Sequence, residues 1–547
     1  MKKRTTAAFM AAVLALLSIF SAVPALALES ISLRYSTPAG YNSNDYQRLV
    51  AFLEQTDDDY IKNGEKLSRE YDPQDPISWD ENEEFFIWES INGQLRLRTI
   101  CLESMEMVGQ LDMSGCDELE SIVCIDNYLT DIDVTDCINL DTLECSGNEI
   151  PRLDLRSNRS LRVLDCGACG LYEIDISTNE GLSEVYCFNN NLSELDASGC
   201  TWLTVLDCGG NNLTSISISG KTHLLELYCE KNSLSTLDVS GCTSLKDLSC
   251  GENLLTRLNI TGCRSLNYLS CQNNMLSELD LSSSTAIETL NCGTNSISSL
   301  SLTGCDALSN LNCSTNQLRQ LDLSDCSALK FLRCQRNGIS TLDLSRKSEL
   351  VDLICSENGL ISLDISRCES LETLDCQLNN LTELDLFDCS ALENLNCDTN
   401  MLTELDLSAC PALPLDRISS EGNGSIGYCY SSFGLDKYIS AEPANGQSFL
   451  GWYDESDNQI STYSTLEIAN IDAREVVAKF SGVESSLPGD VDCSGDVTFT
   501  DVTILYSYLL NTNEFSIRPN GLVNADVNRD GSISVMDITL TYGIILG

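Results

Sequence analysis

The sequence predicts a solenoid of stacked coils with a parallel β-sheet, a helical cap before it, and a small β domain and a helical module after it. Cysteine recurs every 21 residues from Cys124 to Cys397, and repetition at a fixed period of this length is typical of solenoids. Near the C-terminus, two twelve-residue stretches with regularly spaced oxygen-bearing side chains, Asp490 to Asp501 and Asp526 to Asp537, indicate a second, smaller module.

The N-terminus predicts export. Lys2, Lys3 and Arg4 precede an apolar run from Ala7 to Val23, and small residues end at Ala27. This order is that of a secretory signal peptide over residues 1–27. No later apolar run is long enough to cross a bilayer, so we expect a secreted, extracellular protein.

The charge limits the partners. With 82 Asp and Glu against 32 Lys and Arg, the formal net charge is −50, which repels phosphate backbones and anionic lipid. We therefore expect neither nucleic acid nor a membrane surface as partner. His223 is the sole histidine, and its position in a turn between strands favours a surface residue over a zinc site or a catalytic triad.

The repeat itself identifies the coil. Residues Leu245 to Cys263 follow the template L-x-x-L-x-C-x-x-N-x-L-x-x-L-D-L-S-x-C, which is a leucine-rich repeat. Fourteen full copies span residues 119–412, within a repeat region of residues 98–415. Leucines at places 1, 4, 11, 14 and 16 should point inward and be covered by neighbouring coils. Asn at place 9 should form a ladder that satisfies backbone groups, and Asp at place 15 with Ser at place 17 a local turn, with a line of cations along the Asp column as the alternative.

The cysteines form two columns, a full one at place 6 and a partial one at place 19. Where the second column carries Asn158, Asn179, Lys221, Ser284 or Lys347, the first keeps its cysteine, so the columns are not paired one to one. Strands ~4.8 Å apart are also further apart than the Cβ atoms of a disulfide. We expect buried free thiols. The redox-like pair Cys166 and Cys169 is explained by the register, since Cys169 takes the Asn place.

This 21-residue repeat with a cysteine column resembles that of one subclass of internalins, bacterial surface adhesins. The resemblance implies an α/β leucine-rich repeat solenoid with a right-handed coil and a parallel sheet on its concave face. Outward strand places 3, 5 and 7 then line that face. Its ligand candidates are Tyr186, Phe188, Asp207, Tyr228, Tyr268 and Phe331, suited to a protein or a glycan, with ordinary surface variation as the alternative.

Both ends of the solenoid need covering. In residues 28–97, an amphipathic helix from Asn42 to Glu54 followed by Trp79 and Trp88 looks like the N-terminal cap of plant-type leucine-rich repeats. Residues 416–482 resemble a small β repeat of bacterial surface proteins, a spacer or a C-terminal cap. Its aromatic residues, Phe449, Trp452 and Phe480, are either its core or a sugar-stacking platform. Residues 483–489 are a linker.

The two twelve-residue loops have the ligand pattern of an EF-hand calcium loop. The predicted ligands, for two Ca²⁺ ions, are Asp490, Asp492, Ser494, Asp496, Thr498 and Asp501 in the first loop and Asp526, Asn528, Asp530, Ser532, Ser534 and Asp537 in the second. A helix follows each loop, over 502–510 and 538–546, but none enters it. Such half EF-hands argue against a sensor, which needs two helices to open.

A pair of loop-helix units over residues 490–547 resembles a type I dockerin, an all-α calcium-binding module. That resemblance implies docking onto a cohesin of a scaffolding protein in a cellulosome-like assembly. The positions that would choose the cohesin are Phe499, Thr500, Tyr506, Ser507, Val535, Met536, Tyr542 and Gly543. Tyr506 and Tyr542 could instead pack between the helices.

The combination predicts a non-catalytic binding protein of a cellulosome. The alternative is a polysaccharide-degrading glycoside hydrolase with an unrecognised carboxylate pair. A regular solenoid offers a shallow open surface rather than a water-excluding cleft, and this favours binding.

Overall fold

The computed structural model describes residues 35–79, 84–430, 437–471 and 473–481, and in the C-terminal module residues 489, 491, 497, 499–509, 525, 527 and 533–546. The predicted signal peptide and nearly all of the predicted linker lie outside these residues. Two compact units, residues 1–305 and 306–547, make up the chain.

The N-terminal cap begins with helix α3 (Ser43–Leu53). Its N-cap residue Asn42 accepts hydrogen bonds from the backbone N–H groups of Asn44 and Asp45 at 3.0 and 3.2 Å, which satisfies two groups that a helix start leaves unpaired. Leu49, Leu53 and their neighbours on one face of α3 are fully buried. Helix α4 (Asn63–Leu67) and the short helix η1 (Pro76–Ser78) follow. The predicted helical cap is present.

The cap also contains a β-hairpin that we did not predict. Strands β1 (Phe86–Ile91) and β2 (Gln94–Cys101) pair antiparallel around Asn92 and Gly93, both with positive φ. An Asn-Gly pair between two β-rich runs is a strong hairpin signal, so the sequence contained the information. β2 then pairs in parallel with the first coil, and it crosses residue 97, where we placed the end of the cap.

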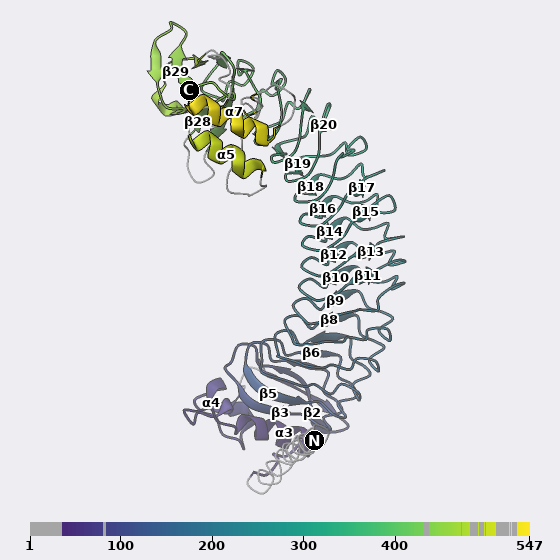
Figure 1. The fold of residues 1–547 in the computed structure, drawn as a ribbon. Coiled ribbons are helices and arrows are strands. Elements are labelled where there is room, and N and C mark those ends of the chain that lie inside the picture. Colours follow the sequence, from purple (N-terminus) through teal and green to yellow (C-terminus); the bar gives the residue numbers. More distant parts are fainter. Residues whose placement is uncertain are drawn as a thin grey trace, which may run out of the picture. The chain divides into compact units, whose positions relative to one another are not determined.

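In the first unit, each coil adds one three-residue strand to a parallel sheet. Paired residues lie 21 positions apart, as in Glu226 with Asp247, so the repeat sets the register. After β2, the strands are β4 (Ser121–Val123), β6 (Thr142–Glu144), β7 (Val163–Asp165), β8 (Glu184–Tyr186), β9 (Val205–Asp207), β10 (Glu226–Tyr228), β12 (Asp247–Ser249), β14 (Tyr268–Ser270) and β16 (Thr289–Asn291) (Figure 1). In the second unit the same pattern gives β18 (Asn310–Asn312), β19 (Phe331–Arg333), β21 (Asp352–Ile354), β23 (Thr373–Asp375) and β24 (Asn394–Asn396).

The return segments of the coils are turns and short strands, with no helix in the described coils. β3 (Val108–Asp112) pairs with β5 (Tyr128–Asp133). Three further pairs are β11 (Thr236–Asp238) with β13 (Arg257–Asn259), β15 (Glu278–Asp280) with β17 (Ser299–Ser301), and β20 (Thr341–Asp343) with β22 (Ser362–Asp364).

The predicted asparagine ladder is confirmed. Asn148 donates from Nδ2 to the carbonyl groups of Cys124 and Cys145, both at 2.9 Å, and its Oδ1 accepts from the backbone N–H of Leu129 at 2.9 Å. Asn211 and most other residues at place 9 repeat this arrangement. Each asparagine thus links its own coil to the preceding one through groups that would otherwise be buried without partners.

The Asp–Ser turn is also confirmed. In one coil the backbone N–H of Ser198 donates to Asp196 Oδ1 at 2.9 Å, and in another that of Ser240 donates to Asp238 Oδ1 at 2.9 Å. Hydrogen bonds from the side chains of Ser198 and Ser240, and then from their backbone N–H groups, lower the pKa of the two carboxyl groups. The column is therefore ionised at neutral pH and serves the local turns, as we expected.

None of the described cysteines forms a disulfide, and nearly all are buried. Burial raises the pKa of Cys187 and of Cys271 to about 12, so both remain neutral thiols. Cys169 occupies the Asn place and donates from Sγ to the carbonyl of Cys145 at 3.1 Å, as an asparagine would. The register therefore accounts for the redox-like pair, as predicted.

Residues of the second cysteine column, at place 19, also donate hydrogen bonds. Cys263 Sγ donates to the carbonyl of Val239 at 3.2 Å, which is place 16 of the preceding coil. Asn158 donates to the equivalent carbonyl of Val134 at 2.9 Å, and Lys347 to that of Leu323 at 2.7 Å. In these coils place 19 therefore supplies a second ladder of hydrogen-bond donors, which explains why Cys, Asn and Lys replace one another there. Ser284 is an exception, since its hydroxyl is buried without a partner among the described residues.

In the second unit a β domain closes the last coil. Strands β25 (Glu404–Asp406), β26 (Arg417–Glu421), β29 (Phe449–Asp454), β30 (Gln459–Ser461) and β32 (Glu475–Phe480) form one sheet, and β27 (Gly424–Tyr430), β28 (Lys437–Pro443) and β31 (Thr465–Glu467) another, with η2 (Ile468–Asn470) between β31 and β32. The backbone N–H of Cys397 donates to the carbonyl of Tyr428 at 2.9 Å, where a further coil would otherwise bind. The domain is therefore a C-terminal cap.

The aromatic residues of this domain are its core. Trp452 is fully buried and Phe480 nearly so. The Phe449 ring packs edge-on against both, with centroid distances of 5.8 and 5.7 Å. This confirms a structural role for the three side chains rather than a sugar-stacking platform.

Candidate functional site

Two tyrosines and an aspartate are brought together on the strand face, the side of the sheet that carries places 3, 5 and 7. Asp207 on β9 pairs with Tyr186 on β8 and with Tyr228 on β10. Each tyrosine donates its hydroxyl to a glutamate two residues earlier, Glu184 or Glu226, at 3.1 Å. These bonds hold the two rings, both half-buried, in equivalent positions two coils apart, about 10 Å.

Carboxylates surround these rings. Burial raises the pKa of Asp207, and the nearby charge of Glu230 adds to it. Burial likewise raises the pKa of Glu144, with Asp165 as the next cause. The pKa of each tyrosine is raised to about 12 by burial and by its neighbouring glutamate. The face is thus partly desolvated and strongly negative.

The other three candidates differ from this group in position or in exposure. Phe188 covers Gly167, where a Cβ would lie 2.5 Å from the phenyl ring, so part of its surface is already used. Tyr268 on β14 is 38 % exposed but stands at place 3, outside the column of Tyr186 and Tyr228. Phe331 on β19 is 44 % exposed and belongs to the second unit.

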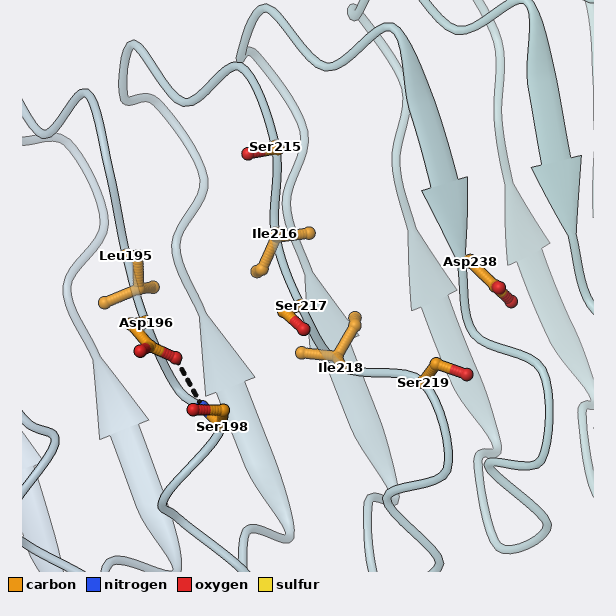
Figure 2. Close-up of a pocket in the computed structure, with 9 residues that line it drawn as sticks. All are labelled: Leu195, Asp196, Ser198, Ser215, Ile216, Ser217, Ile218, Ser219 and Asp238. Atoms are coloured by element: carbon orange, nitrogen blue, oxygen red, sulfur yellow. Dashed lines mark hydrogen bonds between the residues drawn. The ribbon is translucent and has the colours of Figure 1, made fainter.

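A cavity of about 580 Å³ lies in the return segments of the coils, away from the strand face. Leu195, Ile216 and Ile218 line it together with Asp196, Ser198, Ser215, Ser217, Ser219 and Asp238 (Figure 2). Ser217 stands where the flanking coils carry Asp196 and Asp238. We did not predict this cavity, although the break in the Asp column marked its position.

His223 lies on the surface, as predicted. Its ring stacks on that of Trp202 in the adjacent coil, with centroids 5.0 Å apart, and Trp202 is 61 % exposed. No partner of the imidazole indicates a catalytic or metal-binding role among the described residues.

In the C-terminal module the two helices begin earlier than predicted. α5 spans Phe499–Leu509 and α7 spans Val535–Leu546, so each helix starts at the tenth place of its loop rather than after the twelfth. Asp501 and Asp537, the twelfth residues, therefore lie in the first helical turn, where the helix dipole favours a negative charge. The difference arises because the last three loop residues already have helical backbone conformation.

Asp501 and Asp537 are both fully buried. The backbone N–H and the hydroxyl of Ser534 donate to Asp537 Oδ2 at 2.9 and 3.1 Å, which orients that carboxylate. Calcium prefers such oxygen ligands, and the two carboxylates occupy equivalent places, the twelfth of each predicted loop. Nine of the twelve predicted ligands lie outside the described residues, namely Asp490, Asp492, Ser494, Asp496, Thr498, Asp526, Asn528, Asp530 and Ser532.

A small apolar core joins the two loop-helix units. Val491, Leu505 and Ala525 are buried together, with Ile504, Ile533 and Ile538 packed against them. At Gly489 a Cβ would lie 3.0 Å from Val497 and 3.3 Å from Ile544 of α7. The start of the first loop-helix unit therefore packs closely on α7. Figure 1 shows α5 and α7 side by side.

The predicted cohesin-contacting residues lie on these two helices, Phe499, Thr500, Tyr506 and Ser507 on α5 and Val535, Met536, Tyr542 and Gly543 on α7. Tyr506 is 56 % exposed, so most of its side chain is not packed between the helices. Of these eight side chains, only that of Tyr506 is among those described.

No helix among the described residues has the length and apolar character needed to span a bilayer. Within the same residues, no three or more His, Cys, Asp or Glu side chains are grouped as a metal site.

Comparisons with known proteins support both parts of the chain. Residues 488–541 match the dockerin type I domain, a calcium-binding module. The functional domain of InlJ from Listeria monocytogenes, which includes a cysteine ladder, is 25 % identical with a TM-score of 0.57 over 70 % of this chain and 90 % of that one. The structure of PEPR1-AtPEP1 is 19 % identical with a TM-score of 0.54 over 66 % and 56 % of the two chains, and shows the same fold. No curated protein matches significantly. The chain thus joins a leucine-rich repeat solenoid with an internalin-like cysteine ladder to a C-terminal dockerin type I domain.

Proposed function

We propose that this is a secreted, non-catalytic binding protein that attaches through its dockerin to a cohesin of a cellulosome-like scaffold. The observation that carries the proposal is the match of residues 488–541 to the dockerin type I domain, together with the burial of Asp501 and Asp537 at equivalent helix starts. Two calcium ions, one per loop, would supply the positive charge that two buried carboxylates need. The chain's own residues then hold α5 and α7 together and present Tyr506 on the surface.

Cohesin binding by the full chain tests the docking proposal. With cohesins of the source organism immobilised, we expect binding in calcium that is lost in a chelator and restored by added calcium. Tyr506→Ala should weaken binding, whereas Tyr463→Ala, which changes another exposed tyrosine (78 % exposed) in the β domain, should not. Absence of calcium-dependent binding to every cohesin tested would refute docking.

The strand face of the solenoid supplies the second binding activity, toward a protein or a plant-wall glycan. Tyr186, Asp207 and Tyr228 support this role because their positions are fixed by strand register and by hydrogen bonds. Tyrosines of this kind contribute much of the affinity in many interfaces.

A glycoside hydrolase remains the alternative, and the raised pKa of Asp207 is the observation that favours it, since a general acid needs such a shift. Assays of the purified chain on cell-wall polysaccharides decide between the two. Hydrolysis that Asp207→Asn abolishes would replace our proposal, and no hydrolysis is the expected result.

A further inference from the structure

The strand face of the first unit carries an uncompensated row of acids. Outward places 3, 5 and 7 of strands β6 to β10 and of β12 form what we call the acidic face. Its seven carboxylates, with no basic residue at any of these places, are Glu144, Asp165, Glu184, Asp207, Glu226, Glu230 and Asp247. The nearby bases stand at its rims, Arg162 and Lys246 at place 2 and Lys231 at place 8, and Arg162 is already paired with Asp141.

Glu230 is the clearest sign of a missing partner. Its side chain lies over Gly209, with its Cδ 3.3 Å from where a Cβ would be. Its Oε2 is buried and has no hydrogen-bond partner among the described residues. A buried carboxylate oxygen without a partner costs free energy, and a cationic group placed beside Glu230 and Asp207 would offset that cost.

In the second unit, a basic residue on the strand face lies close to a carboxylate. At place 5 of β19 it carries Arg333, whose guanidinium lies 3.8 Å from Asp352 at place 3 of the next strand. In the acidic face, the equivalent places hold Tyr186 and Tyr228 between carboxylates. The acidic face thus has no basic residue at places 3, 5 and 7, whereas the second unit carries Arg333 at place 5.

We infer that the acidic face binds an extended, basic polypeptide segment whose Lys or Arg side chains lie among the carboxylates and over the rings of Tyr186 and Tyr228. This rests on the proposed binding role of the strand face and names its ligand class. The charges lie on six adjacent strands and span about 24 Å, the length of about seven residues of extended chain. A row of separated charges fits a polymer of cations better than a single ion or a neutral glycan, and aromatic rings attract cations as well.

The test uses the full chain with calcium and a fluorescent decapeptide of alternating lysine and glycine. A peptide of alternating glutamate and glycine, together with cellohexaose and xylohexaose, serves for comparison. The first variant removes three charges from the acidic face while keeping side-chain shape: Glu184→Gln, Asp207→Asn and Glu226→Gln. Its matched control removes three exposed charges elsewhere on the solenoid: Glu180→Gln, Glu194→Gln and Glu278→Gln.

We expect the acidic-face variant to bind the lysine peptide about tenfold more weakly than the wild type, and the control variant to bind within about twofold of it. A second pair separates the rings from the charge. Tyr186→Leu with Tyr228→Leu should weaken binding about fivefold, whereas Tyr172→Leu, at a tyrosine 66 % exposed on a return segment, should not.

Equal losses in the acidic-face variant and its control would show non-specific attraction by a chain of charge −50 and would overturn the inference. Binding of cellohexaose or xylohexaose instead of the peptide, lost in the tyrosine variant, would also overturn it but would leave the strand face as a binding surface. Failure of all probes would overturn the inference, while cohesin binding would still decide the docking proposal.

Discussion

Replacing Asn211 by alanine removes one rung of the asparagine ladder and should destabilise the coils on either side. The side chain is 7 % exposed. Its Oδ1 accepts from the backbone N–H of Leu192 at 3.0 Å, and its Nδ2 donates to the carbonyl groups of Cys187 and Cys208 at 2.9 and 3.1 Å. Asn211→Ala therefore leaves the amide of Leu192 buried without this partner.

The magnitude follows from these three bonds. A buried unsatisfied amide costs about 1–3 kcal/mol. The carbonyl of Cys187 keeps a bond from Asn190 and that of Cys208 one from Asn232, so each loses a second bond, worth about 0.5–1 kcal/mol. The sum is about 2–5 kcal/mol. Asn212→Ala, at the next and exposed residue, should cost less than about 0.5 kcal/mol.

Urea denaturation followed by circular dichroism compares the two variants with the wild type. Hydrogen exchange adds the local measurement, because stability in a solenoid is set mainly by neighbouring repeats. Asn211→Ala should accelerate exchange at Leu192 and in the adjoining coils, while coils far along the chain keep their protection. A denaturation midpoint and exchange pattern equal to those of Asn212→Ala would refute the ladder as a source of stability.

Three further predictions concern single side chains. Cys263→Asn should retain the stability of the protein because place 19 needs a donor, whereas Cys263→Val should lose about 1 kcal/mol in urea denaturation; equal stabilities would contradict the second ladder. Asp207→Asn should stabilise the protein at pH 7. Burial raises the folded-state pKa of Asp207. The contribution of wild-type Asp207 to the free energy of unfolding is therefore most favourable below the unfolded pKa, about 3.9, and this favourable contribution is lost as pH rises through the folded pKa. The difference in stability between Asp207→Asn and the wild type should therefore shrink toward about pH 3.5. A difference in stability that does not change with pH would contradict this explanation. Asp537→Ala should lower the number of calcium ions bound by one in calorimetric titration, and an unchanged stoichiometry would remove Asp537 from the ligands.

The sequence predicted the parts of the fold that repeat, because every coil repeats the same physical requirement. The spacing of Cys124 and its equivalents gave the strand register, and Asn148 gave the ladder. The hairpin of β1 and β2 was missed because it occurs once, although Asn92 and Gly93 marked it. The donor role of Cys263 was hidden because a thiol reads as a small apolar group, and it becomes clear only beside Asn158 and Lys347.

In the candidate sites, too, the features set by the repeat were predictable and those set by burial were not. Register alone predicted that Tyr186 and Tyr228 share a column, and the structure confirms that Asp207 lies between them. Burial could not be read from residue type, so the raised pKa of Asp207 and the unpartnered oxygen of Glu230 were not foreseen. The start of α7 was misplaced because the loop pattern and the helix pattern overlap at Asp537.

The two ladders share one offset, since Asn148 and Cys263 each reach a carbonyl 24 positions earlier in the chain. Loss or duplication of one whole coil would therefore leave the remaining asparagines and cysteines with their carbonyl partners. Insertion or deletion of one residue would instead disrupt both ladders at that coil. The cap residue Tyr428 would then accept from whichever coil came last. The number of coils can thus change in steps of 21 residues while the remaining coils keep the contacts of both ladders.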